Sequence, residues 1–284
     1  MVNSRTITLT SLAMLAFAGN SILCRLALKT TAIDPASFTT IRLASAAAAL
    51  WAILSLRGKS RPILGNWPSA LALFVYAAGF SFAYIGLKAG TGALLLFGSV
   101  QTSMISFGLW KGERFNLLQI SGFILAIIGL IVLVFPGLSA PPISSSALMI
   151  LAGVAWGVYS LRGRGAGDAT MTTAGNFIRT LPMALALSLI TWQSAALDLN
   201  GMLLAITSGA ITSGIGYAIW YSALPQLKAT QAATVQLSVP VIAALGGIML
   251  IGEPLSLRLV MASLAILAGI GMVLFNKQVA KPKS

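Results

Sequence analysis

The sequence of 284 residues contains no histidine, a single cysteine (Cys24) and only five acidic residues. Without histidine there is no Ser–His dyad, no imidazole general base and no histidine-ligated metal. One cysteine excludes an intramolecular disulfide and a thiolate metal cage. The phosphate-binding pattern G-x-x-x-x-G-K-[ST] is also absent, and no polar stretch is long enough for an ATPase domain. The composition argues against an enzyme and a primary pump, and we expect neither a metal nor another cofactor.

Charged residues make up 8% of the chain, whereas soluble domains carry about 25%. Hydrophobic residues make up 57%, and the mean hydropathy is +0.93. Such an apolar excess is typical of a membrane protein, whose outer surface faces lipid. In a soluble protein the net charge of +13 would suggest a nucleic-acid partner. Because the lipid bilayer is the partner indicated here, we expect no nucleic acid and interpret the charge by its position along the chain.

Ten apolar stretches are long enough, at about 20 residues, to span the hydrocarbon core as helices. Short polar breaks or glycine and proline residues separate them. The predicted spans are Ile7–Leu28, Pro35–Leu56, Trp67–Leu87, Thr91–Trp110, Asn116–Phe135, Ser146–Leu161, Thr170–Trp192, Gly201–Leu224, Ala229–Ile251 and Ser256–Phe275. We therefore expect an all-α polytopic membrane protein with ten transmembrane helices.

The two halves of the chain resemble each other. Lys111–Asn116 leads into one span as Ile251–Ser256 leads into another, 140 positions later. Gly129 and Gly269 follow at the same spacing. Self-similarity of this kind indicates an internal repeat. The predicted division is a first five-helix repeat, a linker and a second five-helix repeat, at residues 1–137, 138–146 and 147–284.

Five helices per half is an odd number, so we expect the second half to insert upside down, as a five-plus-five inverted-topology repeat. With a cytoplasmic N-terminus, twelve of the eighteen Lys and Arg residues lie inside and two lie within spans. The four outside are Arg25, Lys29, Lys88 and Arg258. Because basic loops stay in the cytoplasm, we expect both termini there, in a bacterial inner membrane.

Four ionisable residues lie within or at the ends of spans, where charge is costly and often functional. Arg42 and Arg179 are within spans, and Glu113 and Glu253 are at span ends. The arginines are candidates for binding a substrate carboxylate, but we favour a structural role in pairing with glutamates or helix-end carbonyls. Each glutamate opens a helix, where a carboxylate complements the N-terminal dipole. The absence of mid-span acids argues for neutral, zwitterionic or anionic cargo.

Uncharged polar and aromatic side chains within spans are better candidates for a transport pathway. Polar groups facing lipid cost free energy, so each is expected to face protein or water. Aromatic rings around a cavity would accept a flat, apolar side chain. Interhelical hydrogen bonding and core packing are the structural alternatives. The candidate substrate-binding residues are Asn20, Tyr84, Gln101, Trp156, Tyr159, Gln231 and Gln236.

Pro240 interrupts the ninth span, and Gly246 and Gly247 follow it. Interrupted segments near the middle of the membrane commonly mark transport sites or hinges. We therefore expect Pro240 to act as a hinge. The corresponding position in the first half is Gln101, so the kink is expected to be asymmetric.

Several motifs occur in a specific order: Phe17–Asn20 opens the chain, Arg42 lies in the second span, and Pro240 precedes Gly252–Ser256. Together with ten spans in two halves, this order resembles the drug/metabolite transporter superfamily in its EamA-type branch. The resemblance covers essentially the whole chain and is greatest to bacterial aromatic amino acid exporters. It implies a basket of ten helices around a central cavity, lined mostly by the first, third, fourth, sixth, eighth and ninth.

Two positions depart from that family's pattern. The proline of its fourth span is Gln101 here, which leaves the symmetry of the hinge in question. The tryptophan often found after Phe17 is Ala18, a smaller residue that would enlarge the cavity near Asn20.

These observations predict a secondary transporter that exports amino acids, with aromatic or hydrophobic ones preferred, by alternating access of the two halves. Two alternatives remain open at this stage. One is a facilitative permease or pore for other small metabolites, and the other is a lipid or sugar-carrier flippase. Monomers are plausible, and the sequence leaves the oligomeric state and any proton coupling open.

Overall fold

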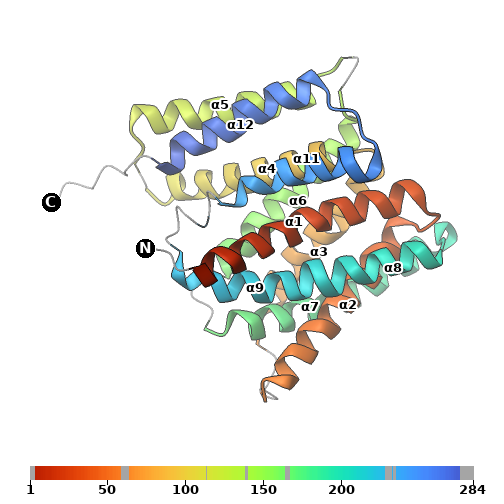
Figure 1. Cartoon of the computed structure of the whole chain (residues 1–284). Coiled ribbons are helices and arrows are strands. Elements are labelled where there is room, and N and C mark those ends of the chain that lie inside the picture. The colour runs from red at the N-terminus through yellow and green to blue at the C-terminus, as the bar shows by residue number, and fades with distance from the viewer. Residues whose placement is uncertain are drawn as a thin grey trace.

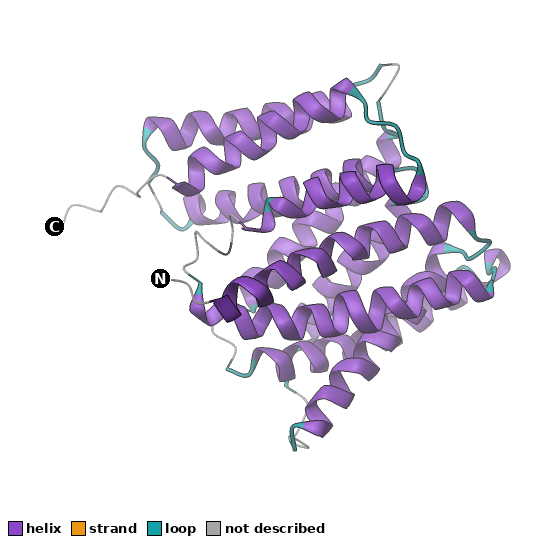
Figure 2. Cartoon of the chain, viewed as in Figure 1, coloured by secondary structure: helices purple, strands orange, loops and turns teal. Residues whose placement is uncertain are grey.

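The computed structural model of the chain describes residues 4–58, 64–112, 114–137, 140–163, 167–227, 232 and 235–275. These residues form helices joined by short loops, with no strand among them (Figure 2). The α-helices are α1 (Ser4–Thr30), α2 (Pro35–Leu56), α3 (Trp67–Ala83), α4 (Ala89–Trp110), α5 (Leu117–Val134), α6 (Ile143–Arg162), α7 (Ala169–Ile190), α8 (Leu199–Thr207), α9 (Gly216–Ala223), α11 (Ser238–Ile251) and α12 (Leu257–Phe275). Shorter helical elements are the π-helix η2 (Ser208–Ile215) and the 3-10 turns η1 (Trp192–Ser194) and η3 (Leu224–Gln226).

Eight helical segments of the described chain are long and apolar enough to cross a membrane. One of them, Leu199–Gln226, is continuous through α8, η2, α9 and η3. The shorter apolar helices are α3 and α11. The all-helical, multi-span part of the prediction is therefore confirmed.

The predicted ninth span, Ala229–Ile251, is interrupted. Leu237 forms a turn, and α11 starts only at Ser238. Pro240 lacks the amide hydrogen that would bond to the carbonyl of Gln236, and its ring clashes with that carbonyl. The helical turn before Leu237 therefore does not continue directly into α11.

Acidic and amide side chains begin several helices. The first backbone amides of a helix have no partner within it, and a side-chain oxygen at the N-cap accepts their hydrogen bonds. The N-cap residues that do so are Asp34 of α2, Asn66 of α3, Asn116 of α5, Asp168 of α7 and Asp198 of α8. Three of the five acidic residues of the chain are thus used at helix starts.

The helices pack in pairs that join distant parts of the chain. In Figure 1, α5 and α12 lie side by side above α4 and α11, and α1 lies beside α9 below them. Elsewhere α6 packs against α3 and α4, and α2 packs against α7 and η2. Large apolar side chains such as Ile124 and Leu264 cover the outside of the α5–α12 pair. That outer surface suits contact with lipid tails.

Glycines permit the closest helix contacts. A Cβ added at Gly122 of α5 would lie 2.6 Å from the carbonyl oxygen of Gly269 in α12. One added at Gly129 would lie 2.8 Å from Ile266 Cγ1 of α12. Gly209 of η2 lies against the carbonyl oxygen of Arg42 in α2 in the same way. Small residues at such positions let transmembrane helices approach with their backbones in contact.

Of the four cations predicted to lie outside, three bind carbonyls at the ends of neighbouring helices, and Lys88 binds a carbonyl of the loop between α11 and α12. Arg25 near the end of α1 donates to the carbonyls of Tyr84 and Ile85, just after α3. The other hydrogen bonds run from Lys29 Nζ to Ile251 O, from Lys88 Nζ to Pro254 O, and from Arg258 Nη1 to Phe135 O. Cations near helix carboxyl ends satisfy carbonyls that have no intrahelical partner. These side chains therefore have a structural role at this end of the bundle.

Candidate functional site

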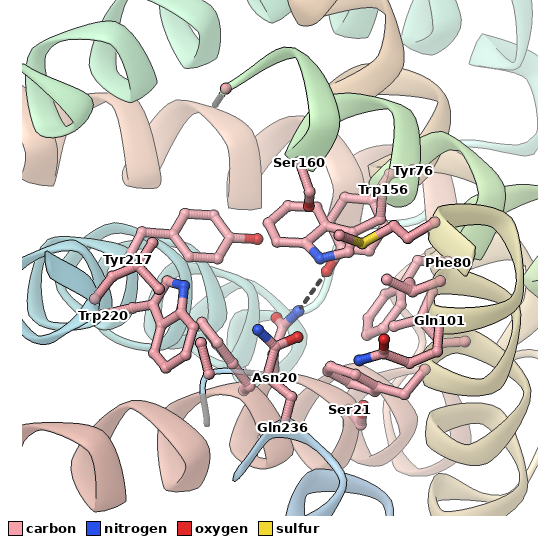
Figure 3. Close-up of a pocket in the computed structure, with 18 of the residues that line it drawn as sticks. Asn20, Ser21, Tyr76, Phe80, Gln101, Trp156, Ser160, Tyr217, Trp220 and Gln236 are labelled. Atoms are coloured by element: carbon pink, nitrogen blue, oxygen red, sulfur yellow. Dashed lines mark hydrogen bonds between the residues drawn. The ribbon is translucent and has the colours of Figure 1, made fainter. Parts of the chain in front are cut away.

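A cavity of about 260 Å³ lies between the helices. Its lining residues come from α1, α3, α4, α6, the η2–α9 segment and the residues before α11 (Figure 3). They are Phe17, Asn20, Ser21, Tyr76, Phe80, Leu96, Phe97, Val100, Gln101, Met104, Trp156, Ser160, Gly163, Thr212, Tyr217, Trp220, Tyr221, Leu224, Ala232 and Gln236. The contributing helices are those that the family resemblance implies. No charged side chain belongs to this described lining, so amides, hydroxyls and aromatic rings define its chemistry.

Asn20 is the central polar group of the cavity wall. Its Nδ2 donates to the hydroxyl of Tyr76 at 3.2 Å. Its Oδ1 accepts from Ser208 Oγ at 2.5 Å and from Thr212 Oγ1 at 3.4 Å. Asn20 is buried, so these bonds satisfy an amide that would otherwise be costly to bury. The network joins α1, α3 and the π-helix η2, a type of element that often occurs at functional sites.

Aromatic rings form one side of the cavity. Trp156 stacks on Tyr217 with ring centroids 5.2 Å apart and lies 4.8 Å from the ring of Tyr76. Phe17 contacts Tyr217 and Trp220 edge-on. Rings held by such contacts present a rigid apolar surface to a flat ligand. In Figure 3, Tyr217 and Trp220 lie on one side of Asn20, and Phe80 and Gln101 lie on the other.

Arg42 lies behind the cavity wall and is 2% exposed. Its guanidinium carbon is 4.8 Å from the centroid of the Phe80 ring and 5.7 Å from that of Tyr76. Nη2 donates to the carbonyl of Ala77 at 3.1 Å. Arg42 thus contacts α3 and pairs with no glutamate that the structure describes.

Of the seven predicted substrate-binding residues, four line the cavity: Asn20, Gln101, Trp156 and Gln236. Gln231 lies outside the described residues. Tyr84 and Tyr159 do not line it, which corrects their assignment to the cavity wall. The Tyr84 hydroxyl donates to the carbonyl of Ala89 at 3.3 Å, and its ring lies against Gly92. The Tyr159 hydroxyl accepts from Asn176 Nδ2 at 3.5 Å, so this ring faces α7.

Sequence reasoning did not select several lining residues: Ser21, Tyr76, Phe80, Thr212, Tyr217 and Trp220. Signals for some of them were present. Tyr217, Trp220 and Tyr221 follow the spacing of one helix face, and Ser21 is adjacent to Asn20. Thr212 carried no such signal, because its position depends on the π-helix.

Glu253 lies at a helix N-terminus, but not at that of the helix that follows it. Its Oε2 accepts from the backbone N–H of Ala89, the first residue of α4, at 2.7 Å. Its Oε1 accepts from Arg25 Nε at 2.9 Å. The expectation that Glu253 opens its own helix was therefore wrong, because the chain folds it back onto α4. Glu113 lies outside the described residues.

The structure also describes Arg179 and Pro240, the remaining candidates for a structural or hinge role. Arg179 Nη1 donates to the carbonyls of Leu64 and Gly175, each at 2.9 Å. Arg179 therefore joins α7 to the chain entering α3. Pro240 is the third residue of α11, directly after the interruption at Leu237.

The chain matches a transporter family along most of its length. The model of the EamA-like transporter family matches it twice, at residues 4–135 and 143–275. An uncharacterized protein of Pseudomonas aeruginosa is 55% identical over 275 residues, covering 96% of each chain. A Salmonella typhimurium protein named "Probable amino-acid metabolite efflux pump" is 25% identical over 211 residues, covering 69% of this chain and 71% of that protein.

One solved crystal structure shares the fold, with a TM-score of 0.65 at 19% sequence identity. The superposition covers 93% of this chain and 96% of the other. The cavity between multi-span helices and the double family match agree with the resemblance found in the sequence. The chain belongs to the EamA-like transporter family.

Proposed function

We propose that this protein exports amino acids, preferring those with aromatic or other hydrophobic side chains, across the bacterial inner membrane. The observation that carries the proposal is an uncharged cavity in which amide groups lie beside an aromatic wall. The amides of Gln101 and Gln236 offer both donors and acceptors to a zwitterion, beside the hydrogen-bonded amide of Asn20. Trp156 and Tyr217 offer a surface for a flat side chain. The name of the Salmonella relative, which refers to amino-acid metabolites, supports the same substrate class.

The size of the cavity favours a small solute. At about 260 Å³ it falls just below the range of about 300–1,000 Å³ for sites that hold drug-sized ligands. A lipid-linked sugar would need a larger space or an opening to lipid. This favours an amino-acid carrier over a flippase.

The proposed transport cycle is alternating access by two inverted five-helix halves. The two family matches, at residues 4–135 and 143–275, support the division into halves. The packing also supports it, because α2 packs against α7, α4 against α11 and α5 against α12, the pairs expected if corresponding helices meet at an axis. The interruption before Pro240 lies next to Gln236 of the cavity and is the proposed hinge. The positive-inside pattern supports cytoplasmic termini.

The test is counterflow in proteoliposomes containing purified protein. Vesicles loaded with unlabelled Trp, Phe, Met or Thr are expected to accumulate the labelled amino acid transiently. Saturation and trans-stimulation mark a carrier, whereas flux that rises linearly with concentration marks a pore. Absence of counterflow for all four amino acids would refute the proposed substrate class.

Trp156→Ala tests the site within the same assay. Loss of its ring contacts removes about 1.5 kcal/mol of aromatic interaction, so we expect kcat/KM to fall roughly tenfold. Trp110→Ala is the matched control, because Trp110 is 78% exposed at the end of α4 and lies outside the cavity. Equal activity of Trp156→Ala and the wild type would remove the cavity from the proposed pathway.

A further inference from the structure

The buried charge of Arg42 is only partly satisfied by its neighbours. Nη2 donates to a carbonyl of α3, and two aromatic rings face the guanidinium. Nη1 is buried without a hydrogen-bond partner among the described residues. Aromatic faces attract a cation but do not neutralise it. A positive charge in surroundings of low dielectric therefore remains directly behind Tyr76 and Phe80, both of which line the cavity.

The carboxylates that the structure describes are committed elsewhere. Asp34, Asp168 and Asp198 cap α2, α7 and α8. Glu253 binds Arg25 and the first amide of α4. The fifth acid, Glu113, belongs in sequence to the connection between α4 and α5. Burying a cation without a paired anion is unfavourable, so an anion that enters beside Arg42 would be stabilised.

The end of the cavity next to Arg42 offers a hydrogen-bond donor. Ser21 lines the cavity and is 1% exposed, and its Oγ has no hydrogen-bond partner of normal geometry among the described residues. A buried hydroxyl without a partner is costly, and a ligand oxygen would satisfy it. Figure 3 shows Ser21 on the side of Phe80 and Gln101, across from Tyr217 and Trp220.

We propose that this end of the cavity, formed by Ser21, Tyr76 and Phe80 in front of Arg42, binds the carboxylate of the transported solute. Arg42 supplies the attractive potential through the ring wall, and Ser21 donates the hydrogen bond. The site thereby selects zwitterions and anions against amines of the same shape. The aromatic rings at the opposite end receive the side chain. This inference rests on the proposed function only in taking the cavity as the substrate site.

A purely structural Arg42, which only holds α2 to α3, would give no charge selectivity. The experiment therefore compares three ligands that share an indole ring: indole-3-propionate as anion, L-tryptophan as zwitterion and tryptamine as cation. Their dissociation constants are measured by calorimetry at pH 7 on purified full-length protein in nanodiscs. For the wild type, we expect the two carboxylates to bind at least about tenfold more tightly than tryptamine, as a single charge-assisted hydrogen bond would give.

The variants separate charge from structure. In Arg42→Gln, we expect tryptamine and indole-3-propionate to bind with similar dissociation constants, so that their ratio is near 1. Arg42→Lys is expected to preserve the preference for the carboxylates. Ser21→Ala is expected to weaken both carboxylates by about three- to tenfold and leave tryptamine unchanged. Ser99→Ala is the matched control, because Ser99 is also a buried hydroxyl without a partner among the described residues but does not line the cavity. If Arg42→Gln does not fold, Ser21→Ala and Arg42→Lys decide the question.

The outcomes distinguish this inference from the proposed function. Two results would overturn the carboxylate site alone, provided that L-tryptophan shows counterflow. One is equal affinity for the three ligands. The other is a charge preference that Ser21→Ala and Arg42→Gln leave unchanged. A charge preference that depends on Arg42, without counterflow of any amino acid, would overturn amino-acid export and leave the carboxylate site standing.

Discussion

The Asp34 side chain caps one helix and also binds the backbone of a second loop. Its Oδ1 accepts from the backbone amides of Ala36 and Ser37, which begins α2. Its Oδ2 accepts from the amide of Ala196, which precedes α8. Burial raises the pKa of this carboxyl, but the hydrogen bonds from Ser37, Ala196 and Ala36 outweigh that effect and lower the pKa below its usual value. The ionised form is therefore the one that stabilises the fold.

Asp34→Ala is expected to destabilise the protein by about 1 kcal/mol at pH 7 through loss of the cap. Because the folded-state pKa is lowered, the contribution of the wild-type carboxylate is present above the unfolded pKa of about 3.9 and is lost as the pH falls below it. The difference between wild type and variant should therefore shrink in acid. Thermal unfolding in detergent at pH 7 and near pH 3 measures this. A difference that grows on acidification would contradict the prediction.

At the scale of helices, the α5–α12 pair depends on two glycines that face each other. Gly122 and Gly269 bring the two backbones so close that a side chain at either position would collide with the carbonyl oxygen of the other. Close backbone contact replaces the hydrophobic effect as the source of helix association in lipid. The sequence repeat already paired Gly269 with Gly129, which also lies in this interface.

Gly269→Leu is expected to lower the stability of the protein by about 1–3 kcal/mol, because overpacking forces the helices apart. The matched control is Gly167→Leu, since a Cβ at Gly167 meets no atom within 4 Å and its backbone has no positive φ. Unfolding midpoints of both variants in the same detergent provide the comparison. Equal midpoints would show that α5 and α12 do not need this contact.

The helices were predictable, whereas the direction of individual side chains was not. Apolar runs of spanning length gave the order of elements, and Pro240 marked the interruption at Leu237. Trp156 and Tyr159 are three residues apart on α6, yet only Trp156 lines the cavity. A helix surrounded by other helices is apolar on several faces, so periodicity does not reveal which face meets the cavity. The same ambiguity misplaced Tyr84, and the fold-back of Glu253 onto α4 had no local signal.

At the scale of the whole molecule, Arg25 and Glu253 join segments that lie far apart in the chain. The two side chains form the salt bridge found among the described residues. Side-chain exposure is 14% for Arg25 and 6% for Glu253. Through these two side chains, the end of α1 is connected to the end of α3, the start of α4 and the loop after α11. The pair holds both proposed halves together at the end predicted to face outside.

Arg25→Gln is expected to cost about 3–5 kcal/mol of stability, because it leaves the buried carboxylate of Glu253 without its counter-charge. The double variant Arg25→Gln/Glu253→Gln should recover part of this loss. A double-mutant cycle of unfolding free energies measures the coupling. Lys29→Gln is the control, since Lys29 is an exposed neighbour with one backbone acceptor. Strict additivity of the two single substitutions would show that the contact is not energetically significant.

The use of carboxylates as helix caps has a consequence for how this transporter would respond to acidity. The described cavity wall carries no acid, so mild acidification leaves its charge unchanged. The Asp34 carboxylate holds the start of α2 in place, and protonating it in strong acid would loosen that helix end. A decline of transport in strong acid would then follow the folded fraction of the protein and would report damage to the scaffold.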